Sequence, residues 1–93
     1  MNESGAFLIR ADPLLIETLK HFAARHNRSA AEAARAALEI YIVMAMLDAL
    51  DNDAEFVAEI RAGGISVAAF REMAEADLAR LRGHAFPRPT AYQ

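Results

Sequence analysis

The side chains of this sequence that could bind a metal or transfer protons are three histidines and a pair of glutamates. His21 and His26 are five residues apart, a spacing that places them on different faces of a helix, and His84 is remote in sequence. Glu72 and Glu75 can share a helix face, but no nucleophile with a paired base and no glycine-rich phosphate loop accompanies them. We therefore expect no metal site, no cofactor and no enzymatic activity, with both glutamates in solvent.

A second group of residues has the types and spacing to bind an anion. Ser29 precedes Glu32 by three positions, which is the pattern of a capping box at a helix start. The N–H groups at a helix start attract anions, and Arg28 adds a positive charge beside them. The alternative is that Ser29 only caps its helix, and the two roles are compatible. Lys20 and Arg25 are expected to be ordinary surface charges.

The composition describes a small folded domain that would gain from self-association. A chain of 93 residues and 10.2 kDa builds a marginal core from one copy, although 55% of its residues are hydrophobic. The absence of cysteine excludes disulfides and thiolate zinc sites. The net charge of −3 disfavours a nucleic-acid binder, but residues 1–35 hold five lysines and arginines against four acids, and residues 36–93 five against nine. The N-terminal segment is therefore the basic one.

No segment of the sequence predicts a membrane protein. The longest uninterrupted apolar run, residues 40–47, is far shorter than the ~20 residues needed to cross a bilayer. The N-terminus does not show the basic start and apolar stretch of a signal peptide. We therefore expect a cytoplasmic protein with no membrane partner.

Two helices are predicted in the first half of the chain. Asp12 followed by Pro13 is a helix start, and Asn27 tolerates the left-handed conformation that ends a helix. The apolar stripe between these signals comprises Leu15, Leu19, Phe22 and Ala23. The second helix is predicted from residue 30 to about residue 50, and its second half, IYIVMAML, is apolar nearly all round. Such a helix must be buried on several sides.

Two shorter helices are predicted in the second half. Asp51 and Asp53 indicate a turn, after which a helix is expected over about residues 54–61, ended by Gly63 and Gly64. Ser66 can cap a last helix, which we expect to end at Gly83, followed by a flexible tail over residues 84–93. The apolar stripe of this last helix comprises Phe70, Met73, Ala74, Leu78 and Leu81.

The stretch AFLIRADP, at residues 6–13, predicts a short strand ahead of these helices. A single strand cannot satisfy its own backbone donors and acceptors, and no second strand is predicted in the chain. We therefore expect the strand to pair antiparallel with its own copy across a two-fold axis. The predicted fold class is mainly α, with one N-terminal strand, two core helices and two C-terminal helices.

The order and spacing of these features resemble the ribbon-helix-helix DNA-binding family of Arc, MetJ and CopG-type repressors. The resemblance covers FLIRADPLLIETLKHFAARHNRSAAEAARAALEIYI, in which HNRS stands where the family often has a Gly-Arg-Ser type turn. It implies a homodimer whose paired strands form a ribbon that enters the major groove of DNA. It also implies that the start of the second helix, at Arg28, Ser29 and Ala30, contacts phosphate.

The resemblance implies roles for the strand residues as well. Alternation along the strand would turn Ala6, Leu8 and Arg10 to the DNA bases. The implied dimer core consists of Phe7, Ile9, Leu38 and Tyr41. Arg10 could read guanine and Leu8 a thymine methyl group, although one arginine per strand is fewer polar contacts than the family usually presents. The alternative is that the strand serves only dimer formation and that Arg10 is a solvated charge.

The second half of the chain leaves the function open between two classes. Compact antitoxins resemble this plan, with a DNA-binding module at residues 1–50 and a helical extension at residues 51–83 that docks on a toxin. The residues predicted to bind such a partner are Phe56, Ile60, Phe70, Met73, Leu78 and Arg88. Alternatively, the extension folds back on IYIVMAML and closes a larger dimer or a tetramer. The prediction is thus a repressor, acting as an autoregulating antitoxin or alone, and the alternative is a helical oligomerisation or adaptor protein that does not bind DNA.

Overall fold

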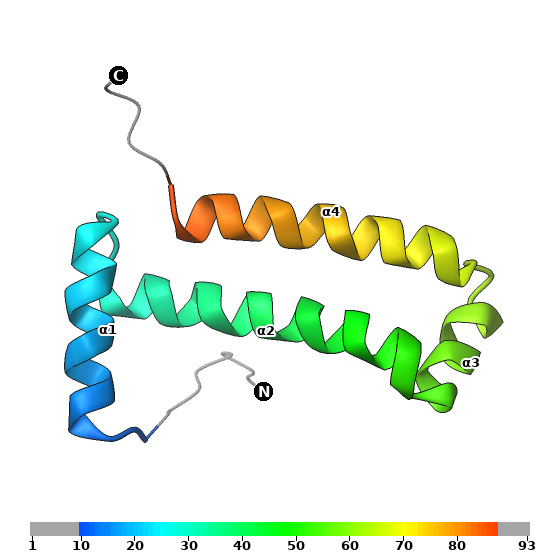
Figure 1. The fold of residues 1–93 in the computed structure, drawn as a ribbon, viewed down its shortest axis with the longest axis horizontal. Coiled ribbons are helices and arrows are strands. Elements are labelled where there is room, and N and C mark those ends of the chain that lie inside the picture. The colour runs from blue at the N-terminus through cyan, green and yellow to red at the C-terminus, as the bar shows by residue number, and fades with distance from the viewer. Residues whose placement is uncertain (1–9, 88–93) are drawn as a thin grey trace, which may run out of the picture.

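The computed structural model of the chain describes residues 10–87. Over this range the chain forms four helices: α1 (Pro13–Arg25), α2 (Ala30–Asn52), α3 (Ala54–Ala62) and α4 (Val67–Ala85). Helices α2 and α4 lie side by side and run in opposite directions, and the short α3 joins them at one end (Figure 1). Helix α1 lies across the other end of α2, so the four helices do not form a bundle around one central core.

The predicted ribbon-helix-helix fold class is wrong. Residues 10–87 contain four helices and no strand, so the part of the chain that is described is all-helical. Arg10, the last residue of the predicted strand, lies outside any helix or strand, and residues 6–9 lie outside the described residues. The physical reason is that a strand exists through the hydrogen bonds of a neighbouring strand, and the described chain provides none.

The helix starts and the first turn are confirmed where short-range signals set them. Asp12 caps α1, with its side chain accepting from the N–H of Leu14. Asn27 has a φ of 59°, the left-handed conformation expected after α1. The capping box before α2 is complete: the N–H of Ser29 donates to Glu32 Oε1 over 2.9 Å, and the N–H of Glu32 donates to Ser29 Oγ over 3.1 Å. These local hydrogen bonds turn the chain sharply from α1 into α2.

The joint between α2 and α3 depends on one aspartate. Asp53 ends α2, and its side chain accepts from the N–H of Phe56 over 3.2 Å, which caps α3. After α3, Gly63 ends the helix and Gly64 adopts a φ of 85°, which favours glycine. Ser66 then caps α4 through the N–H of Ala69. Short loops at both ends of α3 make α4 return along α2.

The predicted end of the last helix at Gly83 is wrong, because α4 continues through Gly83 to Ala85. Glycine inside a helix costs about 1 kcal/mol relative to alanine, an amount that tertiary contacts can offset. Here the guanidinium of Arg28 donates to the carbonyl of His84, and the ring of His26 lies edge-on to that of Phe86 at 5.3 Å. The last turn of α4 is therefore held by the turn between α1 and α2.

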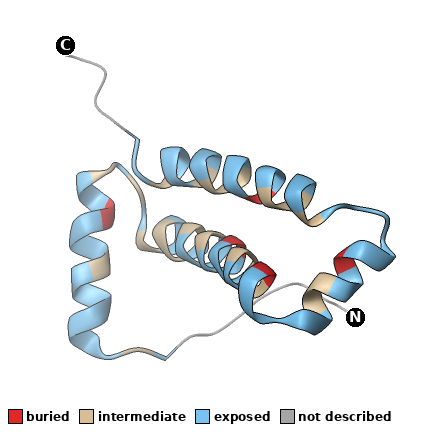
Figure 2. Cartoon of the chain, turned by 45° about the vertical axis from the view of Figure 1, so that its right-hand side comes forward, coloured by how far each residue is buried: buried red, intermediate tan, exposed pale blue. Residues whose placement is uncertain are grey.

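Few side chains are buried, and most of those lie where α2 meets its neighbours (Figure 2). The buried residues among those described are Ala23, Val43, Leu50, Ile60 and Ala74, and none of them is fully enclosed. Two of the five are alanines, which contribute little buried area. A core of this size is thin for a domain of this length.

The apolar segment IYIVMAML is not covered on several sides in a single chain, contrary to expectation. Val43 is buried, but Tyr41, Ile42 and Met44 are all more than half exposed. Helix α4 covers one face of α2, and α1 crosses only its N-terminal end. The remaining faces of α2 have no neighbour within residues 10–87.

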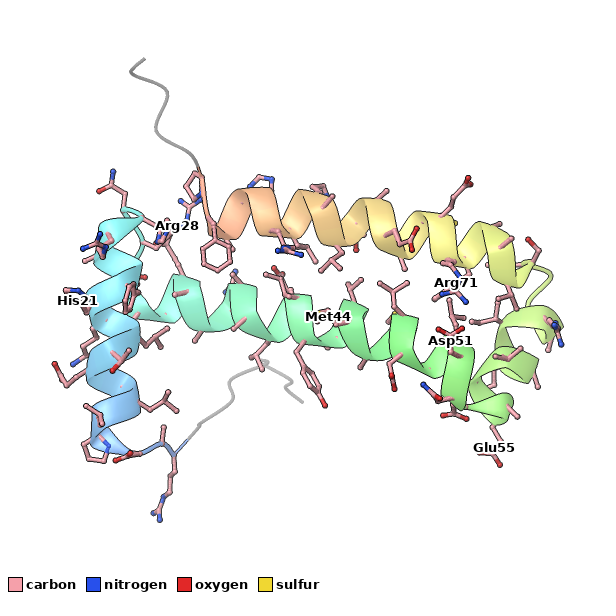
Figure 3. The ribbon with its side chains drawn as sticks, in the orientation of Figure 1. His21, Arg28, Met44, Asp51, Glu55 and Arg71 are labelled. Atoms are coloured by element: carbon pink, nitrogen blue, oxygen red, sulfur yellow. The ribbon has the colours of Figure 1, made fainter. Side chains whose placement is uncertain are left out.

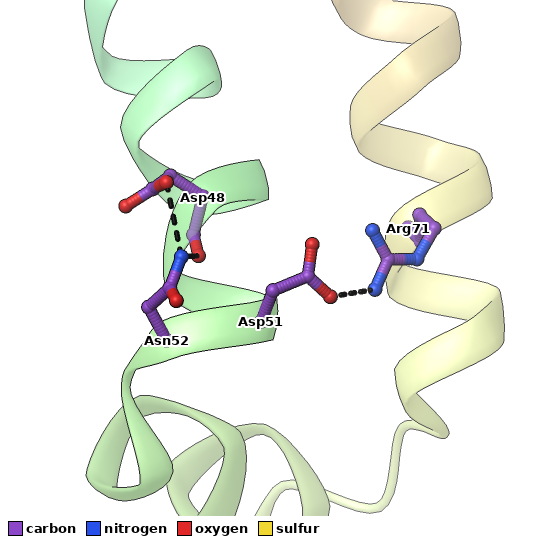
Figure 4. Close-up of polar contacts among 4 residues, drawn as sticks. All are labelled: Asp48, Asp51, Asn52 and Arg71. Atoms are coloured by element: carbon purple, nitrogen blue, oxygen red, sulfur yellow. Dashed lines mark hydrogen bonds and ion pairs between the residues drawn. The ribbon is translucent and has the colours of Figure 1, made fainter.

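An ion pair ties α2 and α4 together near α3 (Figure 4). Arg71 on α4 donates to Asp51 Oδ1 on α2 over 2.9 Å. In the same turn of α2, the side-chain amide of Asn52 donates to the backbone carbonyl and the carboxylate of Asp48. Together with the contact of Arg28 on His84, this pair attaches α4 at both of its ends.

Candidate functional site

An exposed apolar surface on α1 and α2 is the most prominent feature of the molecule. It consists of Leu15 and Phe22 on α1 and Leu38 and Tyr41 on α2, and we call it the α1–α2 apolar surface. Tyr41 is 70% exposed, Leu15 60%, Phe22 53% and Leu38 41%. Large apolar side chains left this open on two adjoining helices mark an interaction site more often than a random surface.

Helix geometry explains why these residues stay uncovered. Val43 and Leu50 are seven residues apart, and both are buried on the face of α2 that contacts its neighbours. Tyr41 precedes Val43 by two residues, about 200° around the helix, and so points to the opposite side. Leu38 shares that side, three residues before Tyr41. On α1, Ala23 is buried, whereas the next residue back, Phe22, lies about 100° around the helix and is 53% exposed.

The predicted dimer core divides between described and undescribed residues. Leu38 and Tyr41 share one face of α2, as the prediction requires, and both are exposed in the single chain. Phe7 and Ile9 lie outside the described residues, as do Ala6 and Leu8 among the predicted base contacts. Arg10, the third predicted base contact, is exposed just before α1. These roles stay predictions.

Two of the six residues predicted to bind a partner protein contact each other, and two more are buried or half-buried. Phe56 of α3 and Phe70 of α4 meet edge to face at a centroid distance of 5.8 Å, and Ile60 is buried. Leu78 is half-buried, whereas Met73 is 60% exposed. Arg88 lies outside the described residues. The α3–α4 corner therefore packs within the chain, and Met73 is the predicted partner contact that is open to solvent.

The predicted phosphate contacts at the start of α2 are partly occupied by the protein itself. The N–H of Ser29 already donates to the carboxylate of Glu32, and the N–H of Glu32 to Ser29. These hydrogen bonds, with the backbone N–H of Ser29 as the largest cause, hold the pKa of Glu32 below the ordinary value of a glutamate, so a negative charge occupies this position at neutral pH. Arg28 is half-buried and donates to the carbonyl of His84, and Ala30 is half-buried as the first residue of α2.

A groove follows the seam between α2 and α4 and has two chemically different parts. One part, of about 710 Å³, is mainly apolar and is lined by Ile42, Val43, Met46, Phe70 and Met73 among others. The other part, of about 510 Å³, is lined by Arg28, Glu32, Arg35, Arg80 and His84 among others. Glu39, Arg80 and Leu81 line both parts, so the two adjoin. Sequence reasoning did not identify Arg35 and Arg80, because they are 45 positions apart and meet only through the antiparallel return of α4.

Charge is separated along the length of the molecule. At the α3 end, two arginines, Arg61 and Arg71, face seven carboxylates, among them Asp51 and Glu55 (Figure 3). At the α1 end, which includes the last turns of α4, residues 10–87 supply seven lysines and arginines and five carboxylates. The basic side chains there are Arg10, Lys20, Arg25, Arg28, Arg35, Arg80 and Arg82. His21 lies at the same end (Figure 3), as do His26, directly after α1, and His84, in the last turn of α4.

Several carboxylates at the α1 end are already engaged. Glu17 pairs with Lys20 over 3.5 Å, Asp77 pairs with Arg80, and Glu32 is held by Ser29. Their charges are thereby partly neutralised by neighbours of opposite sign or by a helix start. The α1 end therefore presents the more positive surface, and part of it comes from α4, in the acidic half of the sequence.

No family model, curated protein or solved structure matches the chain. The resemblance to ribbon-helix-helix repressors is thus a sequence-based expectation whose fold is wrong for the described residues. Within residues 10–87, no helix combines the length and apolar character required to cross a membrane, and histidine and carboxylate side chains form no cluster of three or more suited to a metal ion.

Proposed function

We propose that this protein is a helical self-association module, in which two copies pair through the α1–α2 apolar surface. The observation that carries the proposal is the exposure of Leu15, Phe22, Leu38 and Tyr41 in a chain whose own core is thin. Burying such side chains against a second copy supplies the hydrophobic free energy that a single copy lacks. The function is then that of an oligomerisation or adaptor protein.

The four exposed residues supply more than half of the area that a standard dimer interface buries. Taking roughly 200 Å² for a fully exposed large side chain, the four residues offer about 450 Å² per chain. A standard interface buries about 800 Å² on each partner, so these residues would form more than half of it. A second copy suits this surface because a two-fold axis brings the same four residues of each chain together.

Light scattering coupled to size-exclusion chromatography tests the proposal. The wild-type chain should elute with twice the mass of 10.2 kDa at micromolar concentration. Tyr41→Glu places a charge in the interface and should give the monomer mass. Met73→Glu is the matched control, because Met73 is a similarly exposed apolar residue on α4. A monomeric wild type, or equal dissociation by both substitutions, would contradict the proposal.

A second candidate, a DNA-binding regulator, is favoured by the separation of charge between the two ends of the molecule. A basic end attracts the phosphate backbone, and the acidic end keeps the complex oriented. Fluorescence anisotropy of DNA from upstream of the gene, compared with scrambled DNA, tests it. Preference for the native sequence that is lost in Arg10→Ala would support direct base reading. Absence of binding to either DNA would leave the adaptor function alone.

A further inference from the structure

The basic part of the α2–α4 groove brings together residues from two distant segments. Arg28 and Arg35 come from the turn before α2 and from its second turn, and Arg80 and His84 come from the last turns of α4. Because α4 runs antiparallel to α2, its C-terminal residues lie beside the start of α2. The result is a cationic concavity that neither segment forms alone.

The three arginines in this part of the groove differ in the hydrogen bonds and ion pairs that they already make within the protein. Arg28 uses one N–H on the carbonyl of His84, which orients its guanidinium without neutralising it. Arg80 pairs with Asp77. Arg35 is exposed and makes no hydrogen bond or ion pair with another residue in the 10–87 range. Arg35 is therefore the cation with the most freedom to bind a ligand.

Two glutamates also line this part of the groove, and their situations differ. Glu32 is held at the start of α2 by the N–H of Ser29, where the helix dipole offsets its charge. Glu39 has no such partner among the described residues and lies where the apolar and basic parts adjoin. The lining holds three arginines against two glutamates, and Asp77 outside it pairs with Arg80, so Arg28 and Arg35 carry the cationic character, with Glu39 as the charge that opposes an anion.

We propose that the basic part of the α2–α4 groove binds the phosphate backbone of duplex DNA, with Arg35 and Arg80 as phosphate contacts. The proposal rests on the DNA-binding candidate function and makes α4 part of the nucleic-acid surface. It extends the sequence-based assignment of Arg28, Ser29 and Ala30, in which α4 has no role. Arginine suits this contact because its planar guanidinium donates two parallel hydrogen bonds to phosphate oxygens.

Charge complementarity favours a polyanion over a small anion as the occupant. Lys20, Arg25 and Arg82 lie at the same end of the molecule outside the groove lining, so a long backbone can meet cations beyond the groove itself. The carboxylates at the α3 end repel a polyanion and direct it to the α1 end. A single phosphate would use the groove alone.

The first experiment measures anisotropy of a fluorescein-labelled duplex of about 25 base pairs with the full chain between about 50 and 200 mM salt. Arg35→Glu should weaken binding by about tenfold or more and flatten the dependence of affinity on salt, because a phosphate contact is lost. Arg61→Glu is the matched control, since Arg61 is an exposed arginine on α3, and it should change affinity by less than about threefold. Equal effects of the two substitutions would overturn the proposal.

A second variant is expected to strengthen DNA binding, a change that loss of folding cannot produce. Glu39→Gln removes the opposing charge and should strengthen binding by about threefold, while Glu72→Gln at the α3 end should not. Circular dichroism on each variant checks that the helix content is retained, and Arg35→Ala replaces Arg35→Glu if the latter unfolds. Unchanged or weaker binding by folded Glu39→Gln would count against a phosphate in this groove.

Competition experiments distinguish a site for inorganic phosphate from a site for DNA. Together with the binding data they also distinguish failure of this groove assignment from failure of the DNA-binding candidate function. If inorganic phosphate displaces the duplex more than sodium chloride of equal ionic strength, the groove is a small-anion site and the proposal fails. If the wild type binds no DNA, the DNA-binding candidate function and this inference fail together. If sequence-specific binding survives Arg35→Glu unchanged, the candidate function stands and only the role of this groove is overturned.

Discussion

The two sides of α2 differ in how far their apolar residues are buried. On one side, α4 lies along α2 and is attached at both ends, by Arg71 on Asp51 and by Arg28 on the carbonyl of His84. On the other side, Tyr41 is 70% exposed and Leu38 41% within residues 10–87, and α1 reaches only the first turns. The α2–α4 side is thus packed within the described residues, whereas the α1–α2 side is more exposed and is the surface we propose for self-association.

This difference accounts for a helix that is apolar nearly all round. A helix packed on one side needs one apolar stripe, and the residues around Val43 and Leu50 provide it. The additional apolar residues, Leu38 and Tyr41, destabilise nothing if they are buried by association, but would favour aggregation if they stayed in water. The exposed apolar surface on α2 is therefore the feature that supports the proposed self-association.

The largest contrast between the two sides is expected from leucine-to-alanine substitutions. Leu50, on the α2–α4 side, is 7% exposed, and Leu50→Ala should lower the free energy of unfolding by about 2–3 kcal/mol. Leu14 on α1 is 72% exposed, and Leu14→Ala should change it by less than about 0.5 kcal/mol. Urea denaturation followed by circular dichroism measures both. Equal losses would mean that Leu50 is no better packed than the exposed Leu14 of α1.

Substitutions of the helix caps should change stability by smaller amounts than Leu50→Ala, and they compare α3 with α1. Asp53 caps α3 with an oxygen 3.2 Å from the N–H of Phe56, so Asp53→Ala should cost about 1 kcal/mol of stability. Asp12 caps α1 with a longer contact of 3.4 Å to the N–H of Leu14, and Asp12→Ala should cost about 0.5 kcal/mol or less. Thermal unfolding of both variants provides the measurement. A larger loss for Asp12→Ala would show that α1 is the better-anchored helix.

The helix starts could be predicted from sequence because each is set within a few residues. Asp12 with Pro13, Ser29 with Glu32, and Ser66 satisfy N–H groups that are two or three positions away. The end of α4 could not be predicted, since it depends on His26 and Arg28, more than fifty residues earlier. Local chemistry therefore sets where helices begin, and tertiary contact sets where this one ends.

The candidate surfaces were less predictable for the same reason. Leu38 and Tyr41 were assigned to a dimer core through the resemblance, and their three-residue spacing places them on one face of α2, although the dimer role stays a prediction. Phe56 and Phe70 were assigned to a partner, although α3 and α4 turn them toward each other. An amphipathic stripe predicts that a residue will be buried, but not against which helix. Here the turn at Gly63 and Gly64 sets which helices meet.

The smallest expected effect lies at the junction of the two sides, where Glu32 closes the capping box. Folding lowers the pKa of Glu32 below its ordinary value of about 4.5, chiefly because the backbone N–H of Ser29 donates to its carboxylate, so the folded state favours the ionised form. This contribution to stability is therefore complete above about pH 4.5 and is lost as pH falls through the lowered pKa.

Thermal unfolding at neutral and acidic pH should show that Glu32→Ala is less stable than wild type only at the higher pH. Glu72→Ala, a substitution of an exposed glutamate on α4, is the control and should leave the pH dependence unchanged. A Glu32→Ala deficit that persists at pH 2 would mean that the side chain acts by packing rather than by charge.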